Sequence, residues 1–171
     1  MDALSALTSR RSIRRYTAET VSGTDVDAIV RAALCAPTAF SQHAARIVVV
    51  RDRDRLAALA ETHKHAWPIA DAACALVVCG DTRVERFPGF YWEQDATAAL
   101  ENALTAATAL GLGTCWIGVH PWPDRTNHVR EAVGLPIGVQ PLGLVAIGHP
   151  AETKPARDVD LGHVHQDRWT E

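Results

Sequence analysis

Hydrophobic residues recur along the chain with two spacings, one helical and one typical of strands. The clearest helical stripe follows Ser22, the expected N-cap, and runs from Val26 to Leu34 before Pro37. Shorter helical patterns cover residues 2–9, 54–62 and 125–133, and Gly134 with Pro136 is expected to stop the last of them. The sequence therefore predicts several amphipathic helices, each with one face available for a core.

Four apolar runs lack helical spacing and predict strands. They are the β-branched residues 47–50, the continuous apolar runs 72–79 and 142–147, and the shorter run 114–118. Apolar residues on both sides of a strand are typical of a sheet that is covered on both faces.

A long alanine-rich helix is predicted from Asp95, as its N-cap, to Gly111. Small residues on several faces allow close approach of other backbones, so this helix is expected to pack on more than one neighbour. Helices and strands combine into an α+β fold in which helices cover a central mixed β-sheet.

Length and a change of pattern near the C-terminus suggest the domain organisation. The 171 residues are enough for one domain with a buried core, so residues 1–171 are expected to form a single unit. Residues 151–171 are rich in charge and show little periodicity, yet they include Trp169. A tail with such an apolar anchor commonly docks on its own domain or on a second subunit.

Composition argues against several classes of function. The net charge of −3 gives no reason to expect nucleic acid or an anionic membrane as a partner. No apolar stretch reaches the length of a membrane span, and no signal peptide is expected, because charged residues interrupt the N-terminal apolar run. The cysteines show no CxxC spacing and lie among apolar residues, which indicates buried thiols and a cytoplasmic location; they are Cys35, Cys74, Cys79 and Cys115.

The sequence gives little support for a metal-binding site or for a catalytic serine nucleophile. His63 pairs with His65 and His163 with His165, but neither pair has a third ligand at sensible spacing, so no metal site is expected. No GxSxG elbow is present either.

Three segments carry candidate chemistry. The run Arg10-Arg11-Ser12-Ile13-Arg14 offers guanidinium groups and a hydroxyl to a phosphate, although such a cluster by itself is more often a solvated basic face. Residues 36–43 form a loop between a helix and a strand, whose plainer interpretation is a simple connection. Residues 111–118 run from a helix end into a strand and lack the glycine spacing of a dinucleotide fingerprint.

Taken together and in this order, the three segments resemble the nitroreductase family, specifically its short single-domain members. Residues 10–14 are similar to the family's Arg-Arg-Ser-hydrophobic-Arg motif, and residues 36–45 to its Ala-Pro-Ser-Ala loop. Residues 95–118 match its helix leading into Gly-Leu-Gly-x-x-Trp-hydrophobic-Gly, and residues 148–157 match its C-terminal motif. The resemblance covers nearly the whole chain.

The resemblance implies an intertwined homodimer with two FMN molecules at its interface and the C-terminal tail docked on the dimer. It assigns the flavin phosphate to the first motif, together with a basic residue near the C-terminus, for which Arg157 is preferred to Lys154. It places the Pro-Ser-Ala loop of the partner subunit and the backbone near Ile117 and Gly118 against the flavin ring. The implied cofactor-binding residues are Arg10, Arg11, Ser12, Arg14, Pro37, Thr38, Ala39, Ser41, Ile117, Gly118 and Arg157.

The activity implied is hydride transfer from NAD(P)H, through FMN, to a nitro compound, quinone or related acceptor by a ping-pong mechanism. No protein side chain is expected to be catalytic, because the flavin carries the chemistry. The chain departs from the family pattern where Ser41 replaces Asn, His43 replaces Gln and Ala44-Ala45 replaces Pro-Trp. The departures at Ser41 and His43 leave flavin binding or storage with little turnover as an alternative. Within the family, the alternative is a specialised role such as reductive dehalogenation or flavin breakdown.

Overall fold

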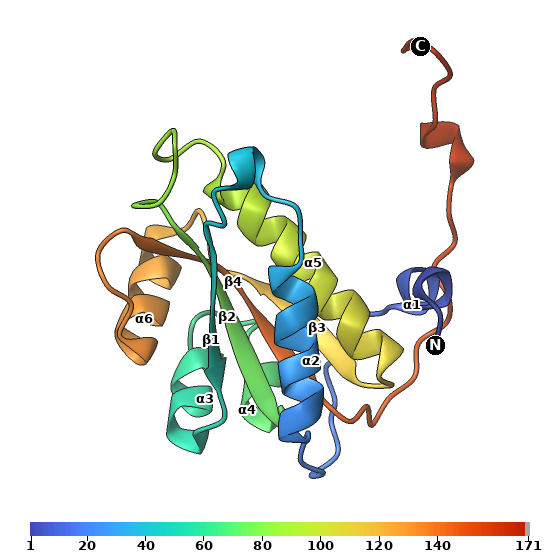
Figure 1. Cartoon of the computed structure of the whole chain (residues 1–171). Coiled ribbons are helices and arrows are strands. Elements are labelled where there is room, and N and C mark those ends of the chain that lie inside the picture. Colours follow the sequence, from blue (N-terminus) through green and yellow to red (C-terminus); the bar gives the residue numbers. More distant parts are fainter. Residues whose placement is uncertain (170–171) are drawn as a thin grey trace.

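A four-stranded sheet with the strand order β1-β2-β4-β3 forms the middle of the computed structural model, which describes residues 1–169 (Figure 1). All three pairs of neighbouring strands are antiparallel. The α+β class is confirmed, but the expected mixed sheet is not: the parallel pairing among the described residues is an isolated bridge between Ser12 and Thr114. The strands are β1 (Ala45–Val50), β2 (Cys74–Asp81), β3 (Gly113–Gly118) and β4 (Val139–Gly148).

Helices cover both faces of this sheet. One face packs against α2 (Gly23–Leu34) and α5 (Trp92–Ala109). The opposite face packs against α3 (Arg53–Ala60), α4 (Pro68–Asp71) and α6 (Pro123–Val133). The remaining helix, α1 (Ala3–Ser9), contacts α5 at one side of the molecule (Figure 1).

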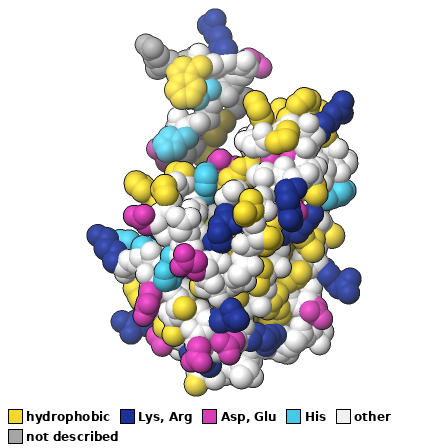
Figure 2. All heavy atoms as spheres, turned by 90° about the vertical axis from the view of Figure 1, so that its left-hand side faces the viewer, with side chains coloured by type: hydrophobic (Ala, Val, Ile, Leu, Met, Phe, Trp, Pro, Cys, Tyr) yellow, Lys and Arg dark blue, Asp and Glu magenta, His cyan; other side chains and the backbone are white. Residues whose placement is uncertain are grey.

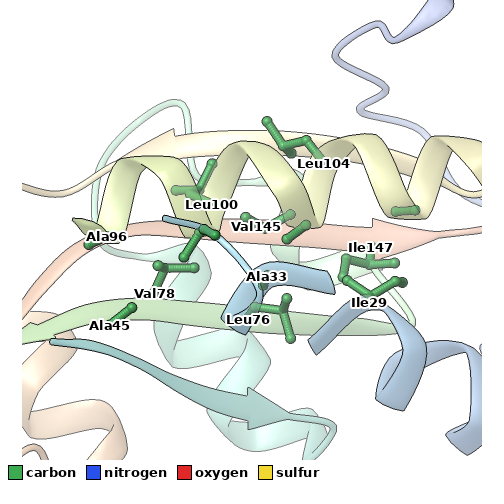
Figure 3. Packing of buried hydrophobic residues seen from close by; sticks show 14 of the residues in the cluster. Ile29, Ala33, Ala45, Leu76, Val78, Ala96, Leu100, Leu104, Val145 and Ile147 are labelled. Atoms are coloured by element: carbon green, nitrogen blue, oxygen red, sulfur yellow. The ribbon is translucent and has the colours of Figure 1, made fainter. Parts of the chain in front are cut away.

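The continuous apolar run of β2 is explained by these two helix layers. Leu76 and Val78 point into the core beneath α2 and α5, where Leu76 lies near Ala33 and Val78 near Ala45 (Figure 3). The alternate residue Val77 points into the core on the opposite face. All eight residues of β2 are buried, so the prediction of burial on both faces is confirmed. Burial on both faces does not fix strand direction, which is why the run gave no signal that the sheet is antiparallel.

Several predicted helix ends agree with the structure. The side chain of Ser22 accepts a hydrogen bond from the backbone N–H of Asp25 and so caps α2. Gly134 ends α6 in the left-handed conformation, with φ of 68°. The prediction that Asp95 caps the long helix is wrong, because α5 begins at Trp92 and Asp95 lies buried in its first turn.

The alanine-rich helix α5 contacts α1, α2 and all four strands, as its small residues predict. Ala96, Ala99, Ala103 and Ala107 are fully buried in the core beneath it. Asn102 on the same helix donates a hydrogen bond from Nδ2 to the carbonyl oxygen of Ala32 on α2, at 3.0 Å. The helix therefore packs against α1, α2 and the sheet at the same time.

The last part of the C-terminal tail projects away from the body of the subunit (Figures 1 and 2). It contains a short 3-10 helix, η2 (Leu161–His163). Trp169 is 78% exposed and stacks on His165 with ring centroids 4.0 Å apart. The Trp169 side chain is thus not buried in its own subunit, and the expected docking of the tail on a dimer remains a prediction. Other exposed apolar side chains of the tail are Val159, Leu161 and Val164.

The cysteines differ in exposure. Cys74, Cys79 and Cys115 are buried in or beside strands, as predicted, whereas Cys35 is exposed just after α2 ends. The prediction is wrong for Cys35 because the apolar stripe of α2 has turned away from the core by Leu34, which is half exposed. Among residues 1–169, no helix is both long and apolar enough to cross a membrane.

Candidate functional site

The arginine motif lies in an extended segment that hydrogen-bonds to β3 and to the start of the C-terminal tail. The backbone N–H of Ile13 donates to the carbonyl oxygen of Thr114 on β3 at 2.8 Å. The backbone N–H of Ala151 donates to the carbonyl oxygen of Arg15 at 2.9 Å. The motif is therefore fixed from two sides by chain segments remote in sequence.

Two glycines allow this segment to approach the sheet. Gly113 and Gly148 are partners in the register of β3 and β4. A Cβ atom on Gly113 would come within 2.8 Å of Ile13 Cγ2, and one on Gly148 within 2.8 Å of Tyr16 Cδ1. A side chain at Gly113 would displace Ile13 of the motif, and one at Gly148 would displace Tyr16 just after it, so both glycines have a packing role beside the arginines.

A cavity of about 630 Å³ lies between α1, the arginine motif and the first part of the tail. The structure brings together all five phosphate-binding residues expected from the sequence, namely Arg10, Arg11, Ser12, Arg14 and Arg157. Their binding role stays a prediction. The other lining residues are Leu7, Thr8, Ser9, Lys154, Ala156 and Val159.

The cavity is strongly cationic. No Asp or Glu is among the lining residues, whereas four arginines and Lys154 are. Within the described part of the chain, Arg11 Nη1 is buried and has no hydrogen-bond partner, and Arg10 Nε lies 3.9 Å from the nearest carboxylate oxygen, that of Glu101. Several guanidinium donors with few internal acceptors match a phosphate monoester, which carries nearly two negative charges. The donor set therefore fits the phosphate of FMN.

Lys154 is held more firmly than Arg157, which the sequence favoured. The Lys154 Nζ donates a hydrogen bond to the carbonyl oxygen of Ser12 at 2.7 Å and lies 3.5 Å from Glu152 Oε1. Arg157 is exposed, and among the described residues it makes no ion pair or hydrogen bond. Sequence alone could not rank the two, because the ranking depends on where the tail crosses the motif.

The second predicted segment is the loop after α2, which includes the 3-10 turn η1 (Ala39–Ser41). The buried Asp95 carboxylate accepts hydrogen bonds from the backbone N–H of Ala39 at 2.8 Å and from Gln42 Nε2 at 3.0 Å. Phe40 and Ser41 both have φ of 52°, a left-handed conformation that costs energy for residues other than glycine. Asp95 thus holds a strained loop in place.

Two polar residues of this loop arrangement were not predicted from the sequence. Asp95 was predicted as a helix cap, but its side chain contacts the loop. Gln42 had no predicted role, yet its amide nitrogen donates to Asp95 and its amide oxygen accepts from the backbone N–H of Arg86. An amide therefore does lie in the loop, one position from Ser41, where the family has its Asn.

Within one subunit, the loop and the cationic cavity lie on different sides of α5. Asp95 contacts the loop, and Glu101 pairs with Arg10 of the cavity. Six residues of an α-helix separate two side chains by about 9 Å along the axis and about 120° around it. None of the loop residues Pro37, Thr38, Ala39 and Ser41 lines the arginine cavity of the same chain.

The third predicted element, at the end of β3, offers only its backbone. The Ile117 side chain is 2% exposed and packs in the core toward α3 and α6, while Gly118 is exposed. Arg125 Nη1 donates a hydrogen bond to the carbonyl oxygen of Gly118 at 3.1 Å. This contact, which the sequence did not suggest, orients the peptide that follows Gly118.

Comparison with known proteins gives a consistent result. A family model described as the nitroreductase family matches residues 7–90 and 68–149. A protein of Methanothermobacter thermautotrophicus, named as a candidate NADH dehydrogenase/NAD(P)H nitroreductase, is 39% identical over 170 residues, which are 99% of this chain and 88% of that protein.

Solved structures show the same fold. A candidate NADH dehydrogenase/NAD(P)H nitroreductase from Parabacteroides distasonis superposes with a TM-score of 0.92 at 31% identity, covering 98% of each chain. A candidate nitroreductase from Desulfovibrio desulfuricans, crystallised in complex with FMN, gives a TM-score of 0.84 at 29% identity and covers 99% of each chain.

Proposed function

The chain belongs to the nitroreductase family, and we propose that it is an FMN-dependent oxidoreductase that takes hydride from NAD(P)H and reduces nitro compounds, quinones or related acceptors. The observation that carries the proposal is the cationic cavity, where four arginines and a lysine surround a space without carboxylates. Binding of FMN to the structurally similar Desulfovibrio desulfuricans protein supports the same assignment.

The phosphate end of FMN is assigned to the cavity. Arg10, Arg11 and Arg14 supply charge-assisted donors, and Ser12 supplies a hydroxyl. Arg157 and Lys154 reach the same space from the tail. These groups bind and orient the cofactor, and bound FMN supplies the hydride chemistry, so that no side chain of the chain needs to act as nucleophile or general base.

A homodimer completes the site in this proposal. The loop that contains Pro37, Thr38, Ala39 and Ser41 does not line the cavity of its own subunit, so it would serve the cavity of a second copy. The exposed apolar residues of the tail, including Trp169, offer a further surface for that copy. In an isolated chain, the apolar side chains of the tail would stay exposed to water and the strained loop would have no ligand to contact.

Turnover is proposed to be ping-pong. If the backbone near Ile117 and Gly118 holds one face of the flavin ring at a dimer interface, only the other face would be open, and the nicotinamide and the acceptor would have to occupy the same position in turn. NAD(P)⁺ would then leave before the acceptor binds. Initial rates at varied NAD(P)H and several fixed acceptor concentrations should give parallel double-reciprocal lines, whereas intersecting lines would show that both substrates bind together.

The experiment that tests the activity is NAD(P)H oxidation by the purified protein with and without added FMN. The proposal predicts oxidation that requires FMN and rises when a quinone or nitroaromatic compound is added. A protein that binds FMN stoichiometrically yet oxidises neither NADH nor NADPH would instead be a flavin-binding or storage protein.

A further inference from the structure

Glu152 is a carboxylate placed next to a cluster of cations without lining their cavity. Its Oε1 accepts a hydrogen bond from the backbone N–H of Arg14 at 2.5 Å and lies 3.5 Å from the Nζ of Lys154. The hydrogen bond from Arg14 is the main reason that the pKa of Glu152 lies below its usual range. The side chain is therefore ionised at neutral pH and bonded to the motif.

Charge alone would make Glu152 a disadvantage beside a phosphate site. A carboxylate repels a bound phosphate, and it also engages Lys154, which is one of the cations of the cavity. If electrostatics were all that mattered, removing Glu152 would strengthen the binding of an anion. Its position calls for a different contribution.

The contacts of the tail indicate that this contribution is to backbone geometry. Ala151 donates to the carbonyl oxygen of Arg15, Glu152 accepts from the N–H of Arg14, and Lys154 donates to the carbonyl oxygen of Ser12. Three tail residues thus hold Ser12 and Arg14 of the motif and Arg15, which directly follows it. Of these contacts, the one from Glu152 acts directly on Arg14, whose side chain lines the cavity.

We propose that Glu152 is a positioning residue, which fixes the backbone of Arg14 so that the arginine side chains are preorganised for the phosphate of the flavin. This inference rests on the proposed function, because it takes FMN to be the ligand of the cavity. Preorganisation raises affinity by reducing the conformational freedom lost on binding. The effect belongs to the phosphate end of the ligand, so riboflavin, which lacks the phosphate, does not benefit from it.

The test compares Glu152→Ala with Glu152→Gln, since both remove the negative charge but only Gln keeps an oxygen that can accept from Arg14. Apoprotein is titrated with FMN and with riboflavin, and binding is followed by flavin fluorescence. Glu19→Ala is the matched control, because Glu19 is an exposed carboxylate that pairs with His149 away from the cavity. A second readout, hydrogen exchange of the Arg14 amide in apoprotein, requires no flavin.

If Glu152 positions Arg14, Glu152→Ala should weaken FMN binding about tenfold, as the loss of a hydrogen bond to a charged group does. The same variant should bind riboflavin as the wild type does. It should also lose the protection of the Arg14 amide against hydrogen exchange. Glu152→Gln should restore most of both properties. If the alanine variant binds FMN as tightly as the wild type or more tightly, the proposal is overturned. An unprotected Arg14 amide in wild-type apoprotein also overturns it, and this readout stands even if the alanine variant does not fold.

The two proposals fail in different ways. Wild-type protein that binds FMN no more tightly than riboflavin would contradict the phosphate site itself. Wild-type protein that prefers FMN strongly, with an alanine variant that keeps the same preference, would contradict only the role of Glu152.

Discussion

The carboxylate of Asp95 accepts the backbone N–H of Ala39 at 2.8 Å, so the first turn of α5 holds the loop that joins α2 to β1. The same carboxylate accepts a hydrogen bond from Gln42 Nε2 at 3.0 Å. This buried carboxylate therefore accepts two hydrogen bonds from a loop whose residues Phe40 and Ser41 have left-handed backbone conformations.

Replacing Asp95 by Ala should destabilise the protein by about 1–3 kcal/mol, because the Ala39 N–H and the Gln42 amide lose their buried acceptor. Thermal unfolding of the two proteins measures the effect. Thr97→Ala, an exposed substitution on the same helix, is the control and should change stability little. Equal melting temperatures for the Asp95 variant and wild type would show that the loop does not depend on this contact.

Replacing Gly113 by Ala should weaken both folding and FMN binding, because the new Cβ would lie 2.8 Å from Ile13 Cγ2 and displace the arginine motif. Overpacking of this kind typically costs about 1–3 kcal/mol. Gly23→Ala at the start of α2 is the control, since nothing lies within 4 Å of its added Cβ. Unfolding in urea and FMN titration should show the two losses together; a Gly113 variant with wild-type FMN affinity would contradict the packing role.

Three of the four thiols should be unreactive in the native protein at pH 8. Burial raises the pKa of Cys74 to about 11 and that of Cys79 to about 12, and it also raises the pKa of Cys115. A raised thiol pKa lowers the thiolate fraction, and the thiolate is the form that attacks disulfide reagents. A colorimetric thiol assay should therefore detect at most one thiol per chain, that of Cys35, and four after denaturation. More than one before denaturation would contradict the burial of the strand cysteines.

A chain that ends at Arg157 should lose dimer stability and release FMN more readily, although it keeps the cations of the cavity. The reason is that truncation removes the exposed apolar residues of the tail, including Trp169. Light scattering over a range of protein concentrations measures the dimer, and flavin fluorescence in the same samples measures release. A truncated protein that remains dimeric with full FMN content would show that the tail has no role in assembly.

Periodicity predicted the elements of this fold well, because the two cores select apolar residues at fixed positions. Ser22 and Gly134 were predictable as helix ends, since capping chemistry is local. Asp95 was misinterpreted because an acidic residue near a helix start is compatible both with a cap and with a buried contact to a distant loop. The direction of the strands was not predictable, because burial on both faces does not fix it. The exposure of Cys35 was missed because apolar neighbours in sequence do not show which face of the helix end is turned to the core.

The candidate site was predictable in its residues but not in its arrangement. Arg10 and Arg14 belong to one motif of five consecutive residues, so the cationic cluster could be predicted from the sequence. Glu152 and Lys154 meet this cluster from about 140 residues away, as their hydrogen bonds to Arg14 and Ser12 show. Long-range contacts of that kind carry no local signal.

Binding of FMN compared with riboflavin, in wild-type protein and in Arg14→Gln, tests the central claim most directly. Arg14 lines the cavity, and losing one charge-assisted bond to phosphate costs about 1.5–3 kcal/mol, or roughly tenfold and upward in affinity. The neighbouring Arg15→Gln is the matched control, because Arg15 is exposed and does not line the cavity. The account predicts that wild-type apoprotein binds FMN much more tightly than riboflavin, and that Arg14→Gln, but not Arg15→Gln, loses most of this preference. Equal weakening of both ligands by Arg14→Gln, or no preference for FMN in the wild type, would contradict it.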